Sequence, residues 1–157
     1  MVLKIFRNEE AKKFGVRSDI SLYSNLNAER TRFSISFGDI FTFQLVRYLK
    51  EKGYPTDPEK LEKELQKNKI KKVFTEQVSP IYKRFEKDTF VVYVPIKTYK
   101  LVDIIADNTD QNKTDICEHI LHPVGQELLK LYNDTKETKL PEEMEEEIKK
   151  TVEEFLH

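Results

Sequence analysis

The sequence predicts an α+β protein, a small mixed domain in which a short antiparallel sheet is packed by several helices. Residues 89–95 are rich in β-branched and aromatic side chains, and residues 33–37 alternate apolar and polar positions, as strands do. Apolar residues at helical spacing recur elsewhere, most clearly over residues 40–52. The length of 157 residues suits a single domain with its own core.

The N-terminal part is predicted to form a strand, a short helix and a loop. Residues 2–6 alternate apolar and polar side chains, which is typical of a strand. The Asn-Glu-Glu run at residues 8–10 can cap a short helix that ends at Gly15. Residues 16–32 have no clear period, so we expect a loop there.

Asp39 stands at the start of a broad amphipathic helix. Gly38 breaks the strand at residues 33–37, and Asp39 is well placed to cap a helix over residues 40–52 that stops at Gly53. A carboxylate where a strand passes into a helix could also bind a metal ion. Capping is the more common role of an aspartate at such a position.

Two further helices lead to the clearest strand. The Asp-Pro pair at residues 57–58 favours the start of a short polar helix over residues 58–66. Apolar residues at helical spacing predict a helix over residues 70–85, which Pro80 would kink or split. The strand at residues 89–95 follows directly.

The chain beyond that strand is predicted to be largely helical. Residues 97–105 fit either a second strand or an amphipathic helix. After a polar loop at residues 108–112, Thr114 is expected to cap a helix that Pro123 ends. Residues 124–132 are helical in pattern again.

Residues 134–157 form an acidic tail with a helical pattern. The tail carries nine acidic and four basic residues, and Pro141 suits the first turn of a helix. Its apolar residues make a seam for packing, formed by Met144, Ile148, Val152 and Phe155. We therefore expect residues 1–157 to form one domain in which residues 134–157 are a docked C-terminal helical segment.

The strongest functional signal is the basic stretch at residues 67–100. It holds nine Lys or Arg residues and three acidic ones, in a chain whose net charge is −1. This asymmetry indicates a polyanionic partner, and Glu86 lies among the cations just before the strand. We expect the DNA-binding cations to be Lys71, Lys72, Lys83, Arg84 and Lys87. A turn with solvated charges is the plainer alternative.

Several functions and locations are disfavoured by composition. The four glycines are not spaced for a phosphate-binding loop, and one cysteine with three histidines does not make a zinc finger. The single cysteine, Cys117, can form no intrachain disulfide. No stretch approaches the roughly 18 uncharged residues of a membrane-spanning helix. We expect a soluble protein that is not secreted.

Metal ligands can be proposed at two places. Mg²⁺ prefers hard oxygen ligands, and two of the carboxylates around the basic stretch would have to converge, with Glu86 and Asp88 the best candidates. The others are Glu76 and Asp103. Asp115, His119 and His122 share one helix face and could bind a transition metal, although a polar helix surface is the commoner explanation.

A familiar nuclease pattern is incomplete in this sequence. Many nucleases place an acid, then an acid-x-lysine triplet, on adjacent strands so that metal and lysine meet at the phosphate. At residues 95–97, Lys97 stands where such a lysine would fall, but Pro95 occupies the position of the acid. A nuclease with this sequence would have to hold its metal differently.

The segment Lys83-Arg84-Phe85-Glu86-Lys87, the chain length and the Lys/Glu/Tyr/Ile-rich composition resemble a small orphan family of lipothrixvirus proteins. Those viruses infect archaea of hot acidic springs, and the Lys/Glu enrichment is a tendency of hyperthermophile proteins. The resemblance covers the whole chain without a widespread motif. It implies an unusual α+β fold, nuclease activity on linear double-stranded DNA, a catalytic role for Glu86, and the cytoplasm of the infected host.

Two hypotheses remain open at this point. In the first, the protein is a Mg²⁺-dependent nuclease in which Glu86 holds the metal or orients water while the neighbouring cations hold phosphates. In the second, it is a non-catalytic DNA-binding or virion-associated protein whose basic stretch neutralises the DNA backbone without cutting it.

Overall fold

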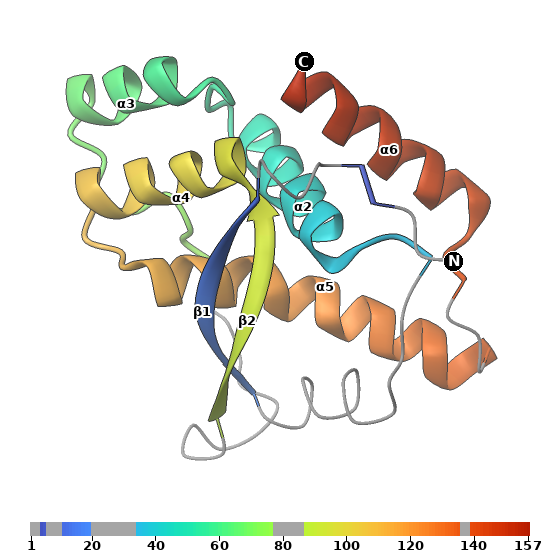
Figure 1. Ribbon diagram of the computed structural model, residues 1–157. Helices are drawn as coiled ribbons and strands as arrows, with labels where there is room; N and C mark the ends of the chain where they lie inside the picture. Colours follow the sequence, from blue (N-terminus) through green and yellow to red (C-terminus); the bar gives the residue numbers. More distant parts are fainter. Residues whose placement is uncertain (1–3, 6–10, 20–33, 77–86, 136–138) are drawn as a thin grey trace.

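The computed structural model describes residues 4–5, 11–19, 34–76, 87–135 and 139–157. Within them, helices pack around one two-stranded antiparallel sheet (Figure 1), so the predicted α+β class is confirmed. The elements are β1 (Ala11–Asp19), α2 (Phe37–Glu51), α3 (Pro58–Lys67), β2 (Lys87–Pro95), α4 (Ile96–Asn108), α5 (Lys113–Thr135) and α6 (Glu142–Leu156). None of these helices is long and apolar enough to cross a membrane.

The sheet is a ribbon of two strands that are distant in sequence. Its register runs from Ala11 opposite Pro95 to Asp19 opposite Lys87. The strand predicted at residues 89–95 is confirmed, but the short helix ending at Gly15 and the loop from residue 16 are wrong over β1. Pairing with β2 outweighs the local helix signal at these residues, and such long-range pairing cannot be recognised from a local sequence pattern.

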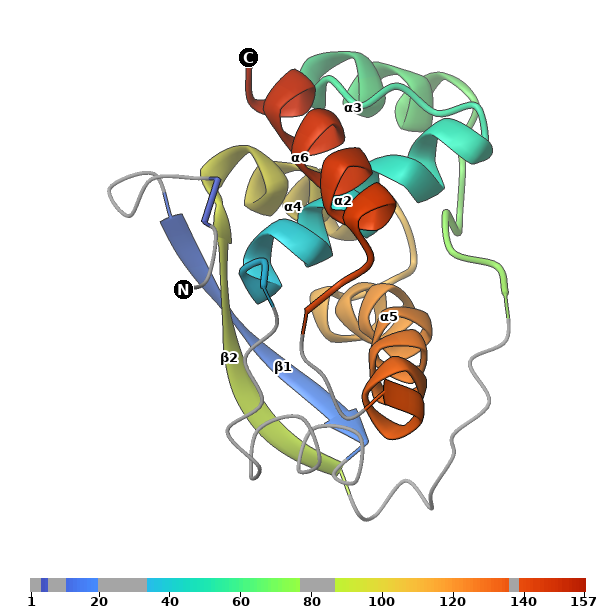
Figure 2. The ribbon, with the colours of Figure 1, turned by 90° about the vertical axis from the view of Figure 1, so that its right-hand side faces the viewer.

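The ribbon lies along one side of the molecule. α2, α4 and α5 make the contacts with it, while α3 and α6 lie at the other end of the body. Its far end, where β1 finishes and β2 begins, points away from α3 and α6 in both views (Figures 1 and 2). The first residues of β2 are therefore well separated from those two helices.

The start of α2 corrects the predicted role of Asp39. Ser36 is the N-cap, its hydroxyl accepts a hydrogen bond from the Asp39 amide at 3.3 Å, and α2 begins at Phe37 rather than after a strand. The Asp39 carboxylate is buried and accepts hydrogen bonds from the Ile5 amide at 2.8 Å and from the Ser36 hydroxyl. Ser36 and Asp39 thus bond to each other at the start of α2, and Asp39 also ties residues 4–5 to this helix.

α3 begins as predicted, and α2 and α3 end in the same way. Asp57 is the N-cap of α3, and its side chain accepts a hydrogen bond from the Lys60 amide at 3.1 Å. Both helices end in a Schellman arrangement with a left-handed residue after the C-cap, Gly53 at φ 78° and Lys69 at φ 49°. The left-handed conformation is sterically unfavourable for lysine but not for glycine.

Three other predictions are decided in the second half of the chain. The helix predicted from residue 70 is wrong over residues 70–76, which run irregularly, and residues 77–85 lie outside the described residues. Residues 97–105 are helical, within α4. α5 begins after Asn112, whose side chain accepts from the Asp115 amide, and it continues through Pro123, which is exposed.

The core has two parts on either side of α2. The larger joins α2, α3, α4 and α5 with Val73, Phe74 and Val94. The smaller lies between the start of α2 and α6 and consists of Ile35, Ile40, Phe43, Leu140, Ile148 and Val152. The predicted seam of α6 is confirmed by burial of Ile148, Val152 and Phe155.

Candidate nucleic-acid interface

Some of the residues predicted for catalysis and DNA binding belong to the described part of the chain, and others do not. Glu86, Lys83 and Arg84 lie outside the described residues. Lys71 and Lys72 are exposed on residues 70–76, hereafter segment 70–76, which follows α3. Segment 70–76 therefore presents two of the predicted DNA-binding lysines to solvent.

The far end of the ribbon carries the residues that follow Glu86 in the sequence. Lys87 and Asp88 are the first residues of β2, and their register partners on β1 are Asp19 and Ser18. Glu86 is the residue just before this pair of strand ends in the sequence. The backbone thus gathers Asp19, Lys87 and Asp88 at one point, and Asp19 was not anticipated from the sequence.

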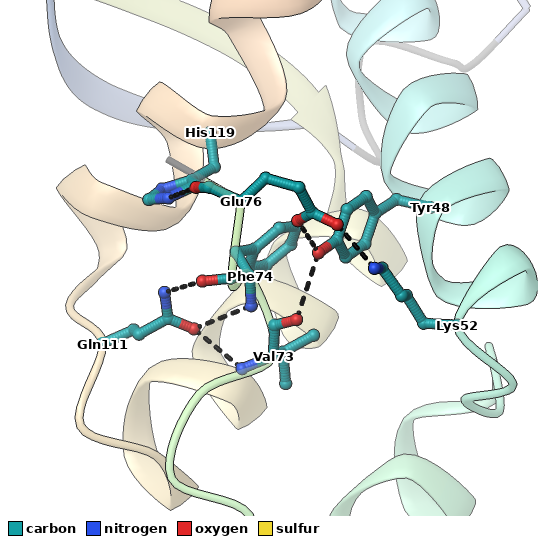
Figure 3. Close-up of polar contacts among 7 residues, drawn as sticks. All are labelled: Tyr48, Lys52, Val73, Phe74, Glu76, Gln111 and His119. Carbon is teal, nitrogen blue, oxygen red and sulfur yellow. Dashed lines mark hydrogen bonds and ion pairs between the residues drawn. The ribbon is translucent and has the colours of Figure 1, made fainter. Parts of the chain in front are cut away.

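Gln111 fastens segment 70–76 to the start of α5. Its amide oxygen accepts hydrogen bonds from the backbone amides of Val73 and Phe74 at 2.9 and 3.0 Å, and its amide nitrogen donates to the Phe74 carbonyl at 2.9 Å (Figure 3). The Asp110 amide donates to the Lys71 carbonyl at 2.8 Å. Because Gln111 is buried, these bonds are shielded from competing water.

Glu76 anchors the end of the segment to α2. Its carboxylate accepts a hydrogen bond from the Tyr48 hydroxyl and pairs with Lys52 at 2.5 Å (Figure 3). The bond from Lys52, and then the one from Tyr48, lowers the pKa of Glu76 from 4.5 to about 2. Burial and the neighbouring Glu76 raise the pKa of Tyr48 well above its ordinary value. Glu76 is therefore ionised and occupied by protein groups rather than presented to a metal.

His119 adds a link between Glu76 and α5. Its Nδ1 lies 2.8 Å from the Asp115 carbonyl oxygen and its Nε2 lies 3.1 Å from the Glu76 carbonyl oxygen. The ring also packs against Phe74, with centroids 5.9 Å apart. Both ring nitrogens are thus directed at backbone, which does not match the proposed metal set with His122, whose side chain is not described.

Asp103 and Lys97 are engaged by other protein groups, and the single cysteine is buried. Asp103 pairs with Lys113 at 2.5 Å, so it does not converge with Glu76 on a common ion. The Lys97 ammonium donates to the Phe155 carbonyl at the end of α6 and lies 4.6 Å from the Phe155 ring centroid. Burial raises the pKa of the Cys117 thiol to about 12, which keeps it protonated and unreactive at neutral pH.

Among the described residues, no group of three or more histidine, cysteine or acidic side chains is arranged so that it could hold a metal ion. No known family, curated protein or solved structure matches this chain. Two parts of the candidate interface are thus held separately: segment 70–76 is fixed between α2 and α5, and the ribbon end is fixed by strand pairing.

The residues that hold this geometry have no signature in the sequence. Gln111 lies in a predicted polar loop, and Tyr48 and Lys52 belong to the face of a predicted helix. Their partners are between 24 and 38 positions away along the chain, from Lys52 with Glu76 to Gln111 with Val73. Only the charge excess of the basic stretch pointed to this region.

Proposed function

We propose that the protein is a nuclease that cuts linear double-stranded DNA by Mg²⁺-dependent phosphodiester hydrolysis, with Glu86 as the catalytic carboxylate. The observation that carries the proposal is the pairing of the strand ends, which places the backbones of Asp19, Lys87 and Asp88 next to one another, directly after Glu86 in the sequence. Lys71 and Lys72 are exposed and belong to the same basic stretch of sequence as Glu86. The resemblance to lipothrixvirus nucleases supports the same activity.

The ribbon end supports a metal site of hard oxygen ligands. Register partners on antiparallel strands have Cα atoms about 4.5–5.5 Å apart, so the backbones of Asp19, Lys87 and Asp88 are close neighbours. Carboxylates from Glu86, Asp88 and Asp19 are the donors that Mg²⁺ prefers, and a lysine beside them suits a phosphate. A bound Mg²⁺ would supply an activated water and offset charge on the phosphate.

The cations have a separate role in this proposal. Lys71, Lys72, Lys83, Arg84 and Lys87 hold DNA phosphates without reading sequence. Affinity for duplex DNA should therefore fall steeply as the salt concentration rises, whereas cleavage depends on the carboxylates. Lys97 is not part of this group, because its ammonium is engaged at the end of α6.

The deciding experiment measures cleavage, duplex affinity and melting temperature on the same variants. Purified protein is incubated with linear duplex and Mg²⁺, with and without chelator. Glu86→Gln is expected to abolish cutting while leaving affinity and melting temperature near those of the wild type. Asp88→Asn and Asp19→Asn are expected to raise the Mg²⁺ concentration needed for half-maximal cleavage.

Asp107→Asn is the matched control, because Asp107 is an exposed aspartate on α4. It should cleave as the wild type does. Full cleavage by Glu86→Gln would refute the catalytic assignment. Wild-type protein that binds duplex in a salt-dependent way but never cuts it would point instead to the non-catalytic DNA-binding or virion-associated role.

A further inference from the structure

The two faces of the ribbon differ in burial. Val94 of β2 is fully buried in the larger core, whereas the adjacent Tyr93 is 58% exposed. Successive residues of a strand belong to opposite faces of a sheet, so the face that holds Val94 is turned toward the body and the face that holds Tyr93 is turned away from it. α2 and α5 lie on one side of the ribbon (Figure 2). The face of Tyr93 is hereafter called the outer face, and the face of Val94 the inner face.

The inner face is apolar along the middle of the ribbon. Its register pairs there are Phe14 with Val92 and Val16 with Phe90. Cross-strand pairs of aromatic and β-branched residues are typical of a sheet face that packs on a core. The register therefore agrees with the burial of Val94, and the remaining residues of the two strands can be assigned to their faces in the same way.

The outer face carries an excess of positive charge. From Lys13 onward, its register pairs are Lys13 with Tyr93, Gly15 with Val91, Arg17 with Thr89, and Asp19 with Lys87. Cationic residues thus outnumber the acidic residue on this face, and the acidic residue stands at its far end. Neither Lys13 nor Arg17 was among the DNA-binding cations expected from the sequence. Only the strand pairing places them beside Lys87.

The spacing of the two new cations suits a DNA duplex. Lys13 and Arg17 are four residues apart on one strand, so their Cα atoms are about 14 Å apart along it. A duplex carries one phosphate charge per about 1.7 Å of its axis, so both cations can meet phosphates of the same duplex. Gly15 lies between them, and the register passes through it without a bulge. A glycine inside a strand often marks a place where another backbone approaches closely.

We propose that duplex DNA lies on the outer face of the ribbon, with Lys13 and Arg17 bound to phosphates and Tyr93 packed against the sugar-phosphate backbone. The outer face ends at Asp19 and Lys87, where the Mg²⁺ site is proposed, so DNA on this face runs directly to the cleaving carboxylates. Contacts to the DNA backbone carry no sequence information, and binding has no sequence preference. The identity of the partner rests on the proposed function.

The first test removes each cation and compares it with a cation on another face. With chelator present to prevent cleavage, Lys13→Gln and Arg17→Gln should each weaken duplex binding about tenfold near 0.1 M salt, and each should reduce the slope of log affinity against log salt by about one. Lys12→Gln makes the same charge change on the inner face, and Lys63→Gln makes it on the exposed surface of α3. Both controls should keep the wild-type slope. The melting temperature of each variant checks that it is folded.

The second test leaves all the cations in place. The chain contains no tryptophan, so Tyr93→Trp places a single indole on the outer face, at a position that is exposed. Its fluorescence should change as duplex is added, along the same curve as binding. His157→Trp, at the exposed C-terminus, is the control and should show no change. If one of the glutamine variants does not fold, Tyr93→Trp decides the proposal.

The outcomes separate the binding surface from the nuclease. Wild-type affinity and slope in both Lys13→Gln and Arg17→Gln, or unchanged fluorescence of Tyr93→Trp at saturating duplex, would overturn the outer face as the DNA surface. If the wild type still cut duplex in that case, the proposed function would stand. A wild type that binds duplex through the outer face but never cuts it would overturn only the nuclease. A wild type that binds no duplex would overturn both.

Discussion

Replacing Gln111 by leucine tests whether segment 70–76 depends on one buried side chain. Gln111→Leu keeps the approximate volume but removes one acceptor and one donor, which leaves the Val73 amide, the Phe74 amide and the Phe74 carbonyl without their partner. Each such bond contributes about 0.5–1.5 kcal/mol net, so the expected loss is about 2–4 kcal/mol. For a chain of this length that lowers the melting temperature by roughly 5–15 °C.

The assay is urea unfolding followed by circular dichroism, with thermal melting in parallel. Gln66→Leu is the matched control, because Gln66 is exposed and its amide donates to the Asn108 side chain at the surface. It should change stability by less than about 0.5 kcal/mol. Equal stability losses in Gln111→Leu and Gln66→Leu would refute the reasoning that Gln111 holds the segment.

Three more outcomes are expected. Lys97→Met should lower the free energy of unfolding by about 1–2 kcal/mol in a urea titration without changing DNA affinity, because the Lys97 ammonium binds the end of α6. Lys100→Met, at an exposed position, should leave stability unchanged in the same titration. Because the pKa of Glu76 is lowered, its contribution to stability is complete above pH 4.5 and is lost as pH falls toward about 2. The NMR chemical shift of its side-chain carboxyl carbon should follow this titration, and a midpoint near 4.5 would contradict the ion pair. Lys69→Gly should stabilise the protein by about 1 kcal/mol in thermal melts, because φ is 49° there, and a loss of stability would show that the position is unstrained.

The helices with strong end signals were predictable from the sequence. The Asp-Pro pair before α3 works through local bonds, since the Asp57 side chain accepts from the Lys60 amide three residues later. The acidic first turn and apolar seam of α6 depend only on helical geometry. In both cases the residues that decide the structure are neighbours along the chain.

β1 and segment 70–76 could not be predicted, because their structures depend on residues that are distant along the chain. Residues 11–15 carry a plausible helix end at Gly15, but pairing with β2 outweighs it, and Gly15 becomes the partner of Val91. The apolar spacing from residue 70 suggested a helix, yet Gln111 takes up the backbone groups of Val73 and Phe74. Each outcome depends on a partner that no local window contains.

The candidate site, too, was predictable from the sequence only in part. The excess of positive charge around Glu86 is a property of composition and was visible at once. The ties from Tyr48, Lys52 and His119 to Glu76 join three separate elements, so they required the folded chain. Asp19 entered the site only through the strand register.

The pairing of β1 with β2 has a consequence for the order of folding. Every register pair of the ribbon joins residues that have the whole of α2 and α3 between them, so the chain must close a long loop before any of these pairs forms. The helices need no such closure and can form early. The ribbon is then expected to assemble late and to open first on heating. Activity that depends on the meeting of Asp19 with Lys87 and Asp88 should disappear at a lower temperature than the helical signal.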